Sequence, residues 1–322
     1  MTLTTQARLV FTLPILILSL SLVGCGATEE VSNPGLARDV SVDLDIGGPD
    51  QRVSYFNVLE TDAPWLTSSD FLSFPRGVAV DDRLGRIYVA EQHGVRMVEM
   101  ETGNLSDFGS GFQQGKTHGI AVGPDSRVYV VDSARAAVVV FNAEGDYQFE
   151  IVVNMPKGIA IDGARDRLYV ADAGNNTVSV WTLEGEYVNA LTTSGMSLPL
   201  QPAINSKGEV YVLSWGDSKL NVWDAEGNYL RGFVQEGTQP GTLLRPKGIA
   251  IDSDDNVYVS DDAFGNVQIW TPQDELALIF GSGGRDLGQF RVPGLLTFDS
   301  EDRLYVPEFM NNRIQIFEYH AL

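Results

Sequence analysis

The chain has 322 residues and carries 43 Asp and Glu against 22 Lys and Arg, which gives a formal net charge of −21. This acidity argues against a nucleic-acid-binding protein, because an acidic surface gains no counterion release on meeting phosphate, and against electrostatic docking on anionic lipid. The contents of 43% hydrophobic and 20% charged residues are typical of a globular protein. The 33 Gly and the single Cys predict many turns and no disulfide framework.

Residues 1–24 have the features of an export signal. Arg8 precedes an apolar run from Leu9 to Val23, and these 15 residues are fewer than the roughly 18–20 that a permanent membrane-spanning helix needs. The run leads into Leu22-Val23-Gly24-Cys25, and Cys25 is the only cysteine. A plain secretory signal with an incidental Cys and an uncleaved anchor are the alternatives to a lipid-bearing Cys25.

The tetrapeptide that ends at Cys25 resembles the lipobox of bacterial lipoproteins. This resemblance implies cleavage before Cys25, which would then carry diacylglycerol and an N-acyl chain such as palmitate. Several acyl chains hold a protein to a membrane without a spanning helix. Gly26 stands where Asp would imply inner-membrane retention, so the resemblance points to the outer membrane of the cell envelope. Residues 25–51 are acidic and rich in turn formers, which predicts a solvated tether.

A Tyr-Val dipeptide occurs at six regularly spaced positions, at intervals of 41, 40, 42, 47 and 47 residues. A Gly precedes the Tyr by ten or eleven positions in five copies, whereas the fourth copy has Gln201 there. A bulky hydrophobic residue follows each Tyr by twelve positions. The six Tyr residues are Tyr88, Tyr129, Tyr169, Tyr211, Tyr258 and Tyr305, and the hydrophobic residues are Met100, Phe141, Trp181, Trp223, Trp270 and Phe317.

Each copy contains four short β-rich runs separated by turn residues, which indicates antiparallel strands. Six such units predict an all-β fold, a six-bladed β-propeller over residues 52–322. The sixth copy ends after its third strand, and the strand-like segment 52–59 precedes the first copy. We therefore expect segment 52–59 to complete blade six and close the ring.

The segments 74–81, 155–162 and 245–252 resemble the opening of NHL repeats, with Pro-x-Gly followed by an apolar run and Asp. The later Asn175-Asn176-Thr177-Val178 and Asn311-Asn312-Arg313-Ile314 are similar to the same family. The resemblance covers residues 52–322 and implies the propeller fold, but such folds host many unrelated functions. We expect the aromatic series at the end of the third strands to pack between blades. This series comprises Phe141, Trp181, Trp223, Trp270 and Phe317. We expect the repeat Gly residues to allow close backbone approach near the axis.

Two sets of polar residues are expected at one mouth of the propeller, because the first strand starts and the second strand ends on the same face. The cationic set comprises Arg76, His118, Lys157 and Lys247, and the acidic set comprises Glu91, Asp132, Asp172, Asp261 and Glu308, with Ser214 in the fourth copy. Turn capping by the carboxylates is the favoured interpretation, since a residue type repeated in every blade fits a structural role. The alternative is that the two sets form a binding site for an anion, peptide or glycan.

No cofactor is evident from the sequence. Some amidating lyases that resemble this fold hold zinc through several His, but only His93, His118 and His320 occur here, so zinc is not expected. Calcium is compatible with carboxylates and Asn around the axis, as in similar lactonases, although no distinctive ligand set stands out. No nucleophile motif is present.

These features predict an envelope lipoprotein whose propeller binds or scaffolds protein, peptide or glycan ligands. The alternative is a propeller enzyme, a lyase or a calcium-dependent lactonase or esterase, with its site at the channel mouth. An enzyme would need one asymmetric cluster of convergent carboxylates or His at the axis, whereas a binding protein can use a broad face. The fourth copy, with Gln201, Ser214 and Trp215, is where we expect asymmetry.

Overall fold

The structure of the protein is a computed structural model that describes residues 37–38, 43–44, 51–59 and 72–321. Every element in these ranges is a β-strand. No helix within them is long and apolar enough to cross a membrane. The predicted export signal and Cys25 lie outside the described residues.

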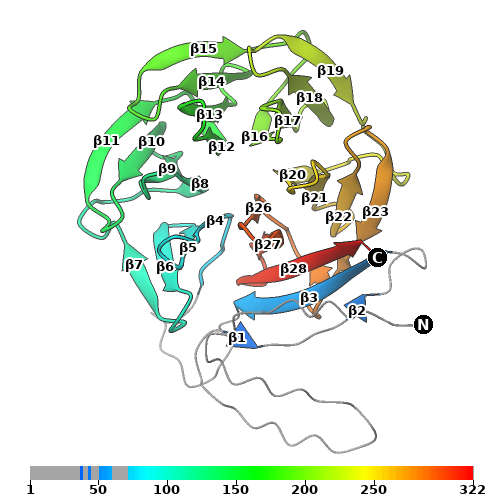
Figure 1. Ribbon diagram of the computed structural model, residues 1–322, viewed down its shortest axis with the longest axis horizontal. Coiled ribbons are helices and arrows are strands. Elements are labelled where there is room, and N and C mark those ends of the chain that lie inside the picture. The colour runs from blue at the N-terminus through cyan, green and yellow to red at the C-terminus, as the bar shows by residue number, and fades with distance from the viewer. Residues whose placement is uncertain (1–36, 39–42, 45–50, 60–71, 322) are drawn as a thin grey trace, which may run out of the picture. The chain divides into compact units, whose positions relative to one another are not determined.

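Six antiparallel sheets are arranged around a central axis as blades (Figure 1). The innermost strands are β4 (Gly77–Asp81), β8 (Thr117–Val122), β12 (Pro156–Asp162), β16 (Pro199–Ile204), β20 (Pro246–Ile251) and β26 (Thr297–Phe298). The second strands are β5 (Arg86–Glu91), β9 (Val128–Asp132), β13 (Arg167–Asp172), β17 (Val210–Ser214), β21 (Val257–Asp261) and β27 (Arg303–Glu308). The third strands are β6 (Gly94–Glu99), β10 (Ala137–Phe141), β14 (Thr177–Trp181), β18 (Lys219–Trp223), β22 (Asn266–Trp270) and β28 (Arg313–Ala321). The outer strands are β7 (Leu105–Phe108), β11 (Tyr147–Val152), β15 (Tyr187–Leu191), β19 (Tyr229–Phe233), β23 (Leu276–Phe280) and β3 (Gln51–Leu59).

The ring closes through β3, which pairs antiparallel with β28 from Gln51 opposite Ala321 to Leu59 opposite Ile314. This confirms the predicted closure of blade six by the segment that precedes the first repeat. Two short strands, β1 (Ala37–Arg38) and β2 (Asp43–Leu44), pair with the free edge of β3. Part of the segment predicted as a tether therefore extends the sheet of blade six.

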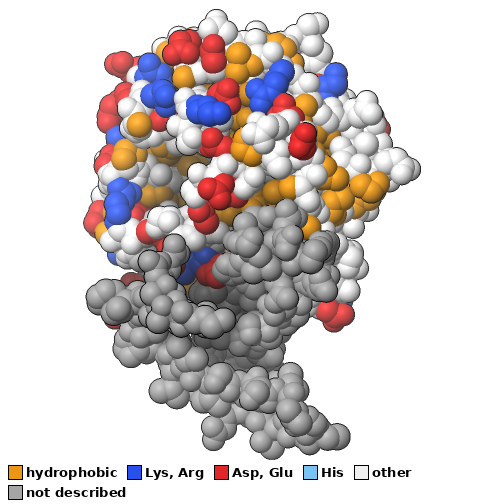
Figure 2. Space-filling model, turned by 45° about the vertical axis from the view of Figure 1, so that its right-hand side comes forward, with side chains coloured by type: hydrophobic (Ala, Val, Ile, Leu, Met, Phe, Trp, Pro, Cys, Tyr) orange, Lys and Arg blue, Asp and Glu red, His pale blue; other side chains and the backbone are white. Residues whose placement is uncertain are grey.

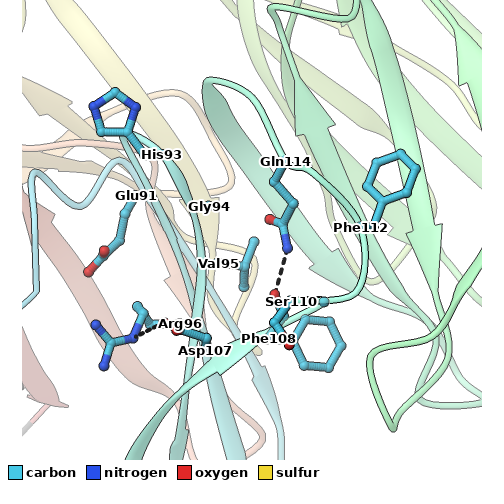
Figure 3. Close-up of a pocket in the computed structure, with 11 residues that line it drawn as sticks. Glu91, His93, Gly94, Val95, Arg96, Asp107, Phe108, Ser110, Phe112 and Gln114 are labelled. Carbon is cyan, nitrogen blue, oxygen red and sulfur yellow. Dashed lines mark hydrogen bonds and ion pairs between the residues drawn. The ribbon is translucent and has the colours of Figure 1, made fainter. Parts of the chain in front are cut away.

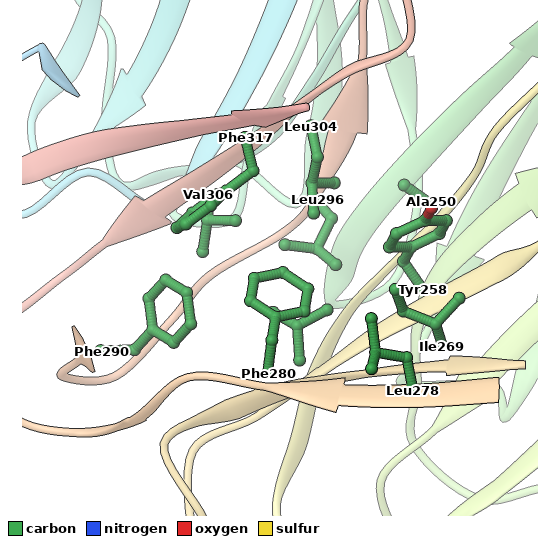
Figure 4. Packing of buried hydrophobic residues seen from close by; sticks show 11 residues of the cluster. Ala250, Tyr258, Ile269, Leu278, Phe280, Phe290, Leu296, Leu304, Val306 and Phe317 are labelled. Atoms are coloured by element: carbon green, nitrogen blue, oxygen red, sulfur yellow. The ribbon is translucent and has the colours of Figure 1, made fainter. Parts of the chain in front are cut away.

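The hydrophobic core lies between neighbouring blades. Phe317 of β28, for example, packs against Phe280 and Phe290 from blade five and the loop after it, with ring centroids 5.2 and 5.7 Å apart (Figure 4). Phe141, Trp223 and Trp270 are likewise buried in clusters shared by two adjacent blades. The aromatic series thus stabilises the contacts between blades, as expected from its fixed place in each repeat.

Met100 follows Tyr88 by the same twelve positions but does not occupy the equivalent place in blade one. The turn between β5 and β6 contains only Gln92 and His93, whereas the same turn has four residues in the other blades. The register shifts by two residues as a result, so that Val98 lies opposite Ile87 where Trp181 lies opposite Leu168 in blade three. Val98 is the buried residue at this position.

On the face opposite the predicted mouth, the turns of neighbouring blades are hydrogen-bonded to one another. The backbone N–H groups of Ser206, Ser253 and Ser300 donate to the carboxylates of Asp255, Asp302 and Asp82, at 2.7, 3.0 and 2.8 Å. Each contact joins one blade to the next. A two-residue parallel ladder, β24 (Ser282–Gly283) with β25 (Gln289–Phe290), lies in the longer loop between blades five and six.

Candidate functional site

The innermost strands approach each other closely around the axis because of the repeat Gly residues. A Cβ added to Gly77 would lie 2.5 Å from the carbonyl oxygen of His118, and one added to Gly119 would lie 2.7 Å from that of Lys157. Real Cβ contacts are longer, so these positions exclude any side chain. The residues before each Gly are thereby fixed side by side at the mouth.

Two of these entry residues, Arg76 and Lys157, form a cationic sector with Lys116 around the entry residue His118, on blades one to three. Burial, together with the positive charges of Arg76, Lys157 and Lys116, lowers the pKa of His118 to about 3. Burial also lowers the pKa of Lys157, again with contributions from Lys116 and Arg76. Each group is therefore close enough to the others for its charge to be felt.

No carboxylate neutralises this sector within the described part of the chain: Arg76, Lys116 and Lys157 form no ion pair there. The guanidinium carbon of Arg76 instead lies 4.7 Å from the ring centroid of Phe309, and this ring lies 4.9 Å from that of Phe74. The Nε of Arg76 is buried without a hydrogen-bond partner. Aromatic rings hold the guanidinium in place and leave its charge available.

The other half of the mouth is different. The entry positions of blades four and six are Leu200 and Pro293, and Lys247 of blade five stands between them in the ring. One residue further along β16, the side-chain amide of Gln201 donates to the carbonyl of Leu296 at 3.0 Å and accepts from the backbone N–H of Ile249 at 2.9 Å. The fourth copy is thus asymmetric as expected, and Gln201 links blades four, five and six near the axis.

The predicted acidic residues cap turns. Asp132 accepts from the backbone N–H of Gly115 at 2.7 Å, and Asp261 accepts from those of Leu244 and Ala263 at 2.7 and 2.8 Å. These carboxylates are almost completely buried. The structure does not bring them together with the cations, and their geometry is that of the favoured capping interpretation.

Asp172 and Glu308 follow the same pattern. Asp172 accepts from the backbone N–H and the side-chain amide of Asn175, at 3.2 and 2.8 Å. Glu308 is fully buried and accepts from the backbone N–H of Arg291 at 3.0 Å and from the amide of Gln315 at 2.7 Å, and it also forms a buried ion pair with Arg313. In blade four, the hydroxyl of Ser214 is buried without a partner.

Glu91 is the exception among the acidic set. Its carboxylate accepts a single hydrogen bond among the described residues, from the backbone N–H of Ser73 at 2.8 Å. Burial raises its pKa to about 7. The short turn between β5 and β6 removes the backbone donors that a longer turn would supply.

Apolar side chains accompany the cations on this face. Phe74, Met155, Trp215 and Met310 are each exposed by 37–50%. Phe74 and Met155 stand two positions before the entry residues of blades one and three, and Met310 lies in the mouth turn of blade six. Over the surface visible in Figure 2, acidic, basic and apolar side chains are interspersed.

The donor set offers no evident metal centre: no group of three or more His, Cys, Asp or Glu side chains that could hold an ion occurs among the residues described. The carboxylates that were considered for calcium are already engaged by backbone N–H groups. As they stand, they do not fit a hard-cation site, which needs six to eight convergent oxygen atoms.

Sequence reasoning missed one residue of the cationic sector, Lys116, and the ring of Phe309 that contacts Arg76. Lys116 aligns with Phe74 and Met155, two positions before the entry residue, so the alignment of the copies could have revealed it. Phe309 follows Glu308 directly, but its contact with Arg76 crosses from blade six to blade one and depends on ring closure. No local sequence pattern predicts such a contact.

Comparison with known proteins is consistent with this fold. The profile of the NHL repeat matches residues 153–181. By sequence, the chain has no significant match among curated proteins.

Solved structures resemble it at low identity. A gluconolactonase from Xanthomonas campestris is 15% identical, with 90% of this chain and 99% of that chain covered and a TM-score of 0.64. An auxiliary nutrient binding protein from Bacteroides thetaiotaomicron is 15% identical, with 77% and 70% covered and a TM-score of 0.63. Virginiamycin B lyase from Staphylococcus aureus is 15% identical, with 80% and 87% covered and a TM-score of 0.60. At such identities the likeness concerns the fold alone. The chain is a six-bladed β-propeller that carries an NHL repeat in its third blade.

Proposed function

We propose that the protein is a lipid-anchored binding protein of the bacterial cell envelope, and that its propeller mouth binds an anionic group of a peptide or glycan ligand. The observation that carries this proposal is the cationic sector of Arg76, Lys116 and Lys157, which no described carboxylate neutralises. The chain as a whole is acidic, yet it holds three positive charges close together at one mouth. These charges repel one another, and a bound anion would relieve the repulsion.

The strength of such binding follows from charge-assisted hydrogen bonds. Each is worth about 1.5–3 kcal/mol when well formed, and the planar guanidinium of Arg76 can hold a carboxylate or phosphate through two of them. The net charge of −21 does not prevent approach, because charges more than about 8 Å away are largely screened at physiological salt. The exposed Phe74 and Met155 would add apolar contacts beside the anion.

Binding is better supported than catalysis. Structural neighbours include a lyase, a gluconolactonase and an auxiliary nutrient binding protein, so the fold accommodates both. A lyase or a calcium-dependent hydrolase needs convergent acid and base groups, whereas Asp132, Asp172 and Asp261 each cap a turn. The mouth offers positive charge and apolar surface instead.

The binding proposal is tested with the triple variant Arg76→Ala, Lys157→Ala, Lys247→Ala. The probes are pentaglutamate and trigalacturonate, each compared with its uncharged counterpart, pentaglutamine and galactotriose. We expect the protein to prefer one acidic probe over its neutral counterpart, and the triple variant to bind it at least about tenfold more weakly. A matched control, Arg83→Ala, Arg167→Ala, Lys207→Ala, removes the same charge from the opposite face. If the triple variant bound the acidic probe as tightly as the wild type, the anion site would not lie at the mouth.

The anchoring proposal rests on the sequence before the propeller and is tested separately. Expressed from its complete sequence in a Gram-negative host, the protein should fractionate with the outer membrane, and mass spectrometry should find an acylated Cys25. Cys25→Ser should release it into the soluble fraction. Membrane association of the Ser variant would favour an uncleaved anchor instead.

A further inference from the structure

A cavity of about 280 Å³ lies beside blade one, but the sheet of that blade divides its lining (Figure 3). Side chains alternate between the two faces along each strand. Those of Glu91, Arg96 and Asp107 therefore lie on one face of the sheet, and those of Val95 and Phe108 lie on the other. One ligand does not meet both the charged and the apolar side chains there. At the propeller mouth, by contrast, cationic and apolar side chains come from the same repeat positions.

Two repeat positions in blades one to three supply these side chains. The inner position is that of the entry residues Arg76, His118 and Lys157. The outer position, two residues earlier in each copy, is occupied by Phe74, Lys116 and Met155. Phe74 and Met155 are exposed by 37% and 50%. Lys116 thus has an exposed apolar side chain at the equivalent place on each neighbouring blade.

Phe74 and Met155 hold these places in an unfavourable backbone conformation. Their φ angles are 55° and 52°, in the left-handed region that bulky residues rarely adopt. Each also precedes a proline, which favours an extended residue before it. Asn or Gly would adopt this backbone at lower cost. Exposed apolar side chains on a strained backbone gain little for the fold, and strained residues concentrate at binding sites.

The distribution of charge over the propeller favours an anion at this mouth. In the described loops of the opposite face, 19 Asp and Glu stand against 4 Lys and Arg. In the described loops of the mouth, 4 Asp and Glu stand against 6 Lys and Arg. The acidity of the chain is therefore concentrated away from the cationic sector, and the mouth is complementary to negative charge.

A ligand that matches this surface carries a carboxylate next to an apolar group. The inner and outer positions are two residues apart, so their Cα atoms are separated by at most about 7 Å. The last residue of a peptide bears both groups on a single Cα, whereas a uronate surrounds its carboxylate with hydroxyl groups. We propose that the anion site of the proposed function, on which this inference rests, receives the C-terminus of a peptide that ends in an apolar residue. The terminal carboxylate meets Arg76 and Lys157, and the apolar side chain packs against Phe74 or Met155.

The test uses the whole chain and three peptides in calorimetric titrations. They are acetyl-Gly-Gly-Phe-Leu with a free carboxylate, the same peptide as its amide, and acetyl-Gly-Gly-Ser-Ser with a free carboxylate. The first should bind at least about tenfold more tightly than the amide, which lacks the charge, and than the Ser peptide, which lacks the apolar side chains. Equal affinity for acid and amide, or for the two acids, would overturn the proposal.

The double variant Phe74→Asn, Met155→Asn removes both apolar side chains and leaves every charge in place. Binding of acetyl-Gly-Gly-Phe-Leu should fall at least about fivefold, while binding of pentaglutamate should stay as in the wild type. Because Asn tolerates the left-handed conformation, the midpoint of urea unfolding should not fall, whereas loss of a structural side chain would lower it. Leu198→Asn, at the equivalent left-handed position of blade four, is the matched control and should bind the peptide normally.

The outcomes distinguish this proposal from the proposed function. If trigalacturonate bound through the mouth cations but the apolar peptide bound no more tightly than the Ser peptide, the anion site would stand and its ligand would be a glycan. If the triple variant of the mouth lost affinity for neither the acidic probes nor the peptide, both proposals would fail. Normal peptide binding by the double Asn variant, or an equal loss of pentaglutamate binding, would overturn the role of Phe74 and Met155.

Discussion

The guanidinium carbon of Arg76 lies 4.7 Å from the ring centroid of Phe309, across the joint where blade six meets blade one. The two residues are 233 positions apart in the chain and meet because the inner strands of blade six pack against those of blade one. This contact positions the one guanidinium of the cationic sector. It therefore links ring closure to the geometry of the proposed anion site.

Phe309→Leu should weaken anion binding without removing any charge. A cation–π contact of this kind is worth about 0.5–2 kcal/mol, so we expect a loss of roughly two- to thirtyfold in affinity for the acidic probe. Isothermal titration calorimetry measures the change. Phe264→Leu, in the corresponding turn of blade five, serves as control. An affinity equal to that of the wild type would show that the ring does not hold Arg76.

His118 should stay neutral down to unusually low pH. Burial and three nearby cations lower its pKa to about 3, against about 6.5 in the unfolded chain. The unfolded state therefore binds more protons below pH 6.5, and the stability of the fold should decline as the pH falls from 6.5 towards 3. His118→Gln should flatten this part of the stability profile in urea titrations. Proton NMR that finds His118 titrating near pH 6.5 would contradict the account.

Neutralising one neighbour should move this pKa upward. Lys157→Met keeps the aliphatic stem and removes one of the charges that disfavour the imidazolium. The pKa of His118 should rise in the variant, as it should when an acidic probe binds to the wild type. NMR titration measures both. If the pKa of His118 changed neither in Lys157→Met nor on binding of the acidic probe, the anion site would lie elsewhere.

Gly77→Ala should destabilise the propeller. The new methyl group would meet the carbonyl oxygen of His118 at 2.5 Å, and backbone must move to admit it. We expect a cost of about 1–3 kcal/mol in the free energy of unfolding. Gly111→Ala is the control, since a Cβ there meets nothing within 4 Å. Equal unfolding midpoints for the two variants would contradict the close approach.

Gln201→Leu tests the link near the axis. The change leaves the N–H of Ile249 and the carbonyl of Leu296 without their partner, at a cost of about 1–3 kcal/mol for each buried group. Gln148→Leu, on the exposed outer strand β11, should change little. Chemical denaturation gives the comparison. A variant as stable as the wild type would mean that water replaces the amide.

Addition of calcium after EDTA should leave the unfolding temperature unchanged. The carboxylates of the mouth already accept backbone hydrogen bonds, so binding an ion would require breaking them. A ligand that binds the folded state raises its apparent stability, so thermal shift would detect even a weak site. A rise with calcium would revive the lactonase alternative.

The sequence was sufficient to predict the blades because each repeat carries its own alternation and turns. Closure by segment 52–59 followed from a missing fourth strand in the last copy. The constant offset of twelve residues from Tyr88 to Met100 hid the shorter turn of blade one, so the sequence did not indicate that Val98 takes the equivalent buried position. The same short turn made Glu91 unlike Asp132 and Asp261, a difference visible only once the hydrogen bonds were known.

The candidate site was predicted less completely. The entry residues Arg76, His118 and Lys157 were found from the repeat, since position in each copy fixes position around the axis. The repeat does not indicate which of these charged side chains are paired with an opposite charge. Whether a carboxylate neutralises a cation or caps a turn depends on the backbone conformation of the nearby loops. These loops differ in length and sequence from blade to blade.

The strand that closes the ring is also the first long strand after the segment that would reach the membrane. Tension applied through that segment would first separate the short strands β1 and β2 from β3. It would then act on β3 at Gln51, where its pairing with Ala321 begins. The covalent hairpins of blades one to five would carry none of it until β3 had peeled away from β28. Under mechanical load the propeller would thus lose its outermost strand in blade six first, before the interface of blades six and one that holds Arg76 against Phe309 is disturbed.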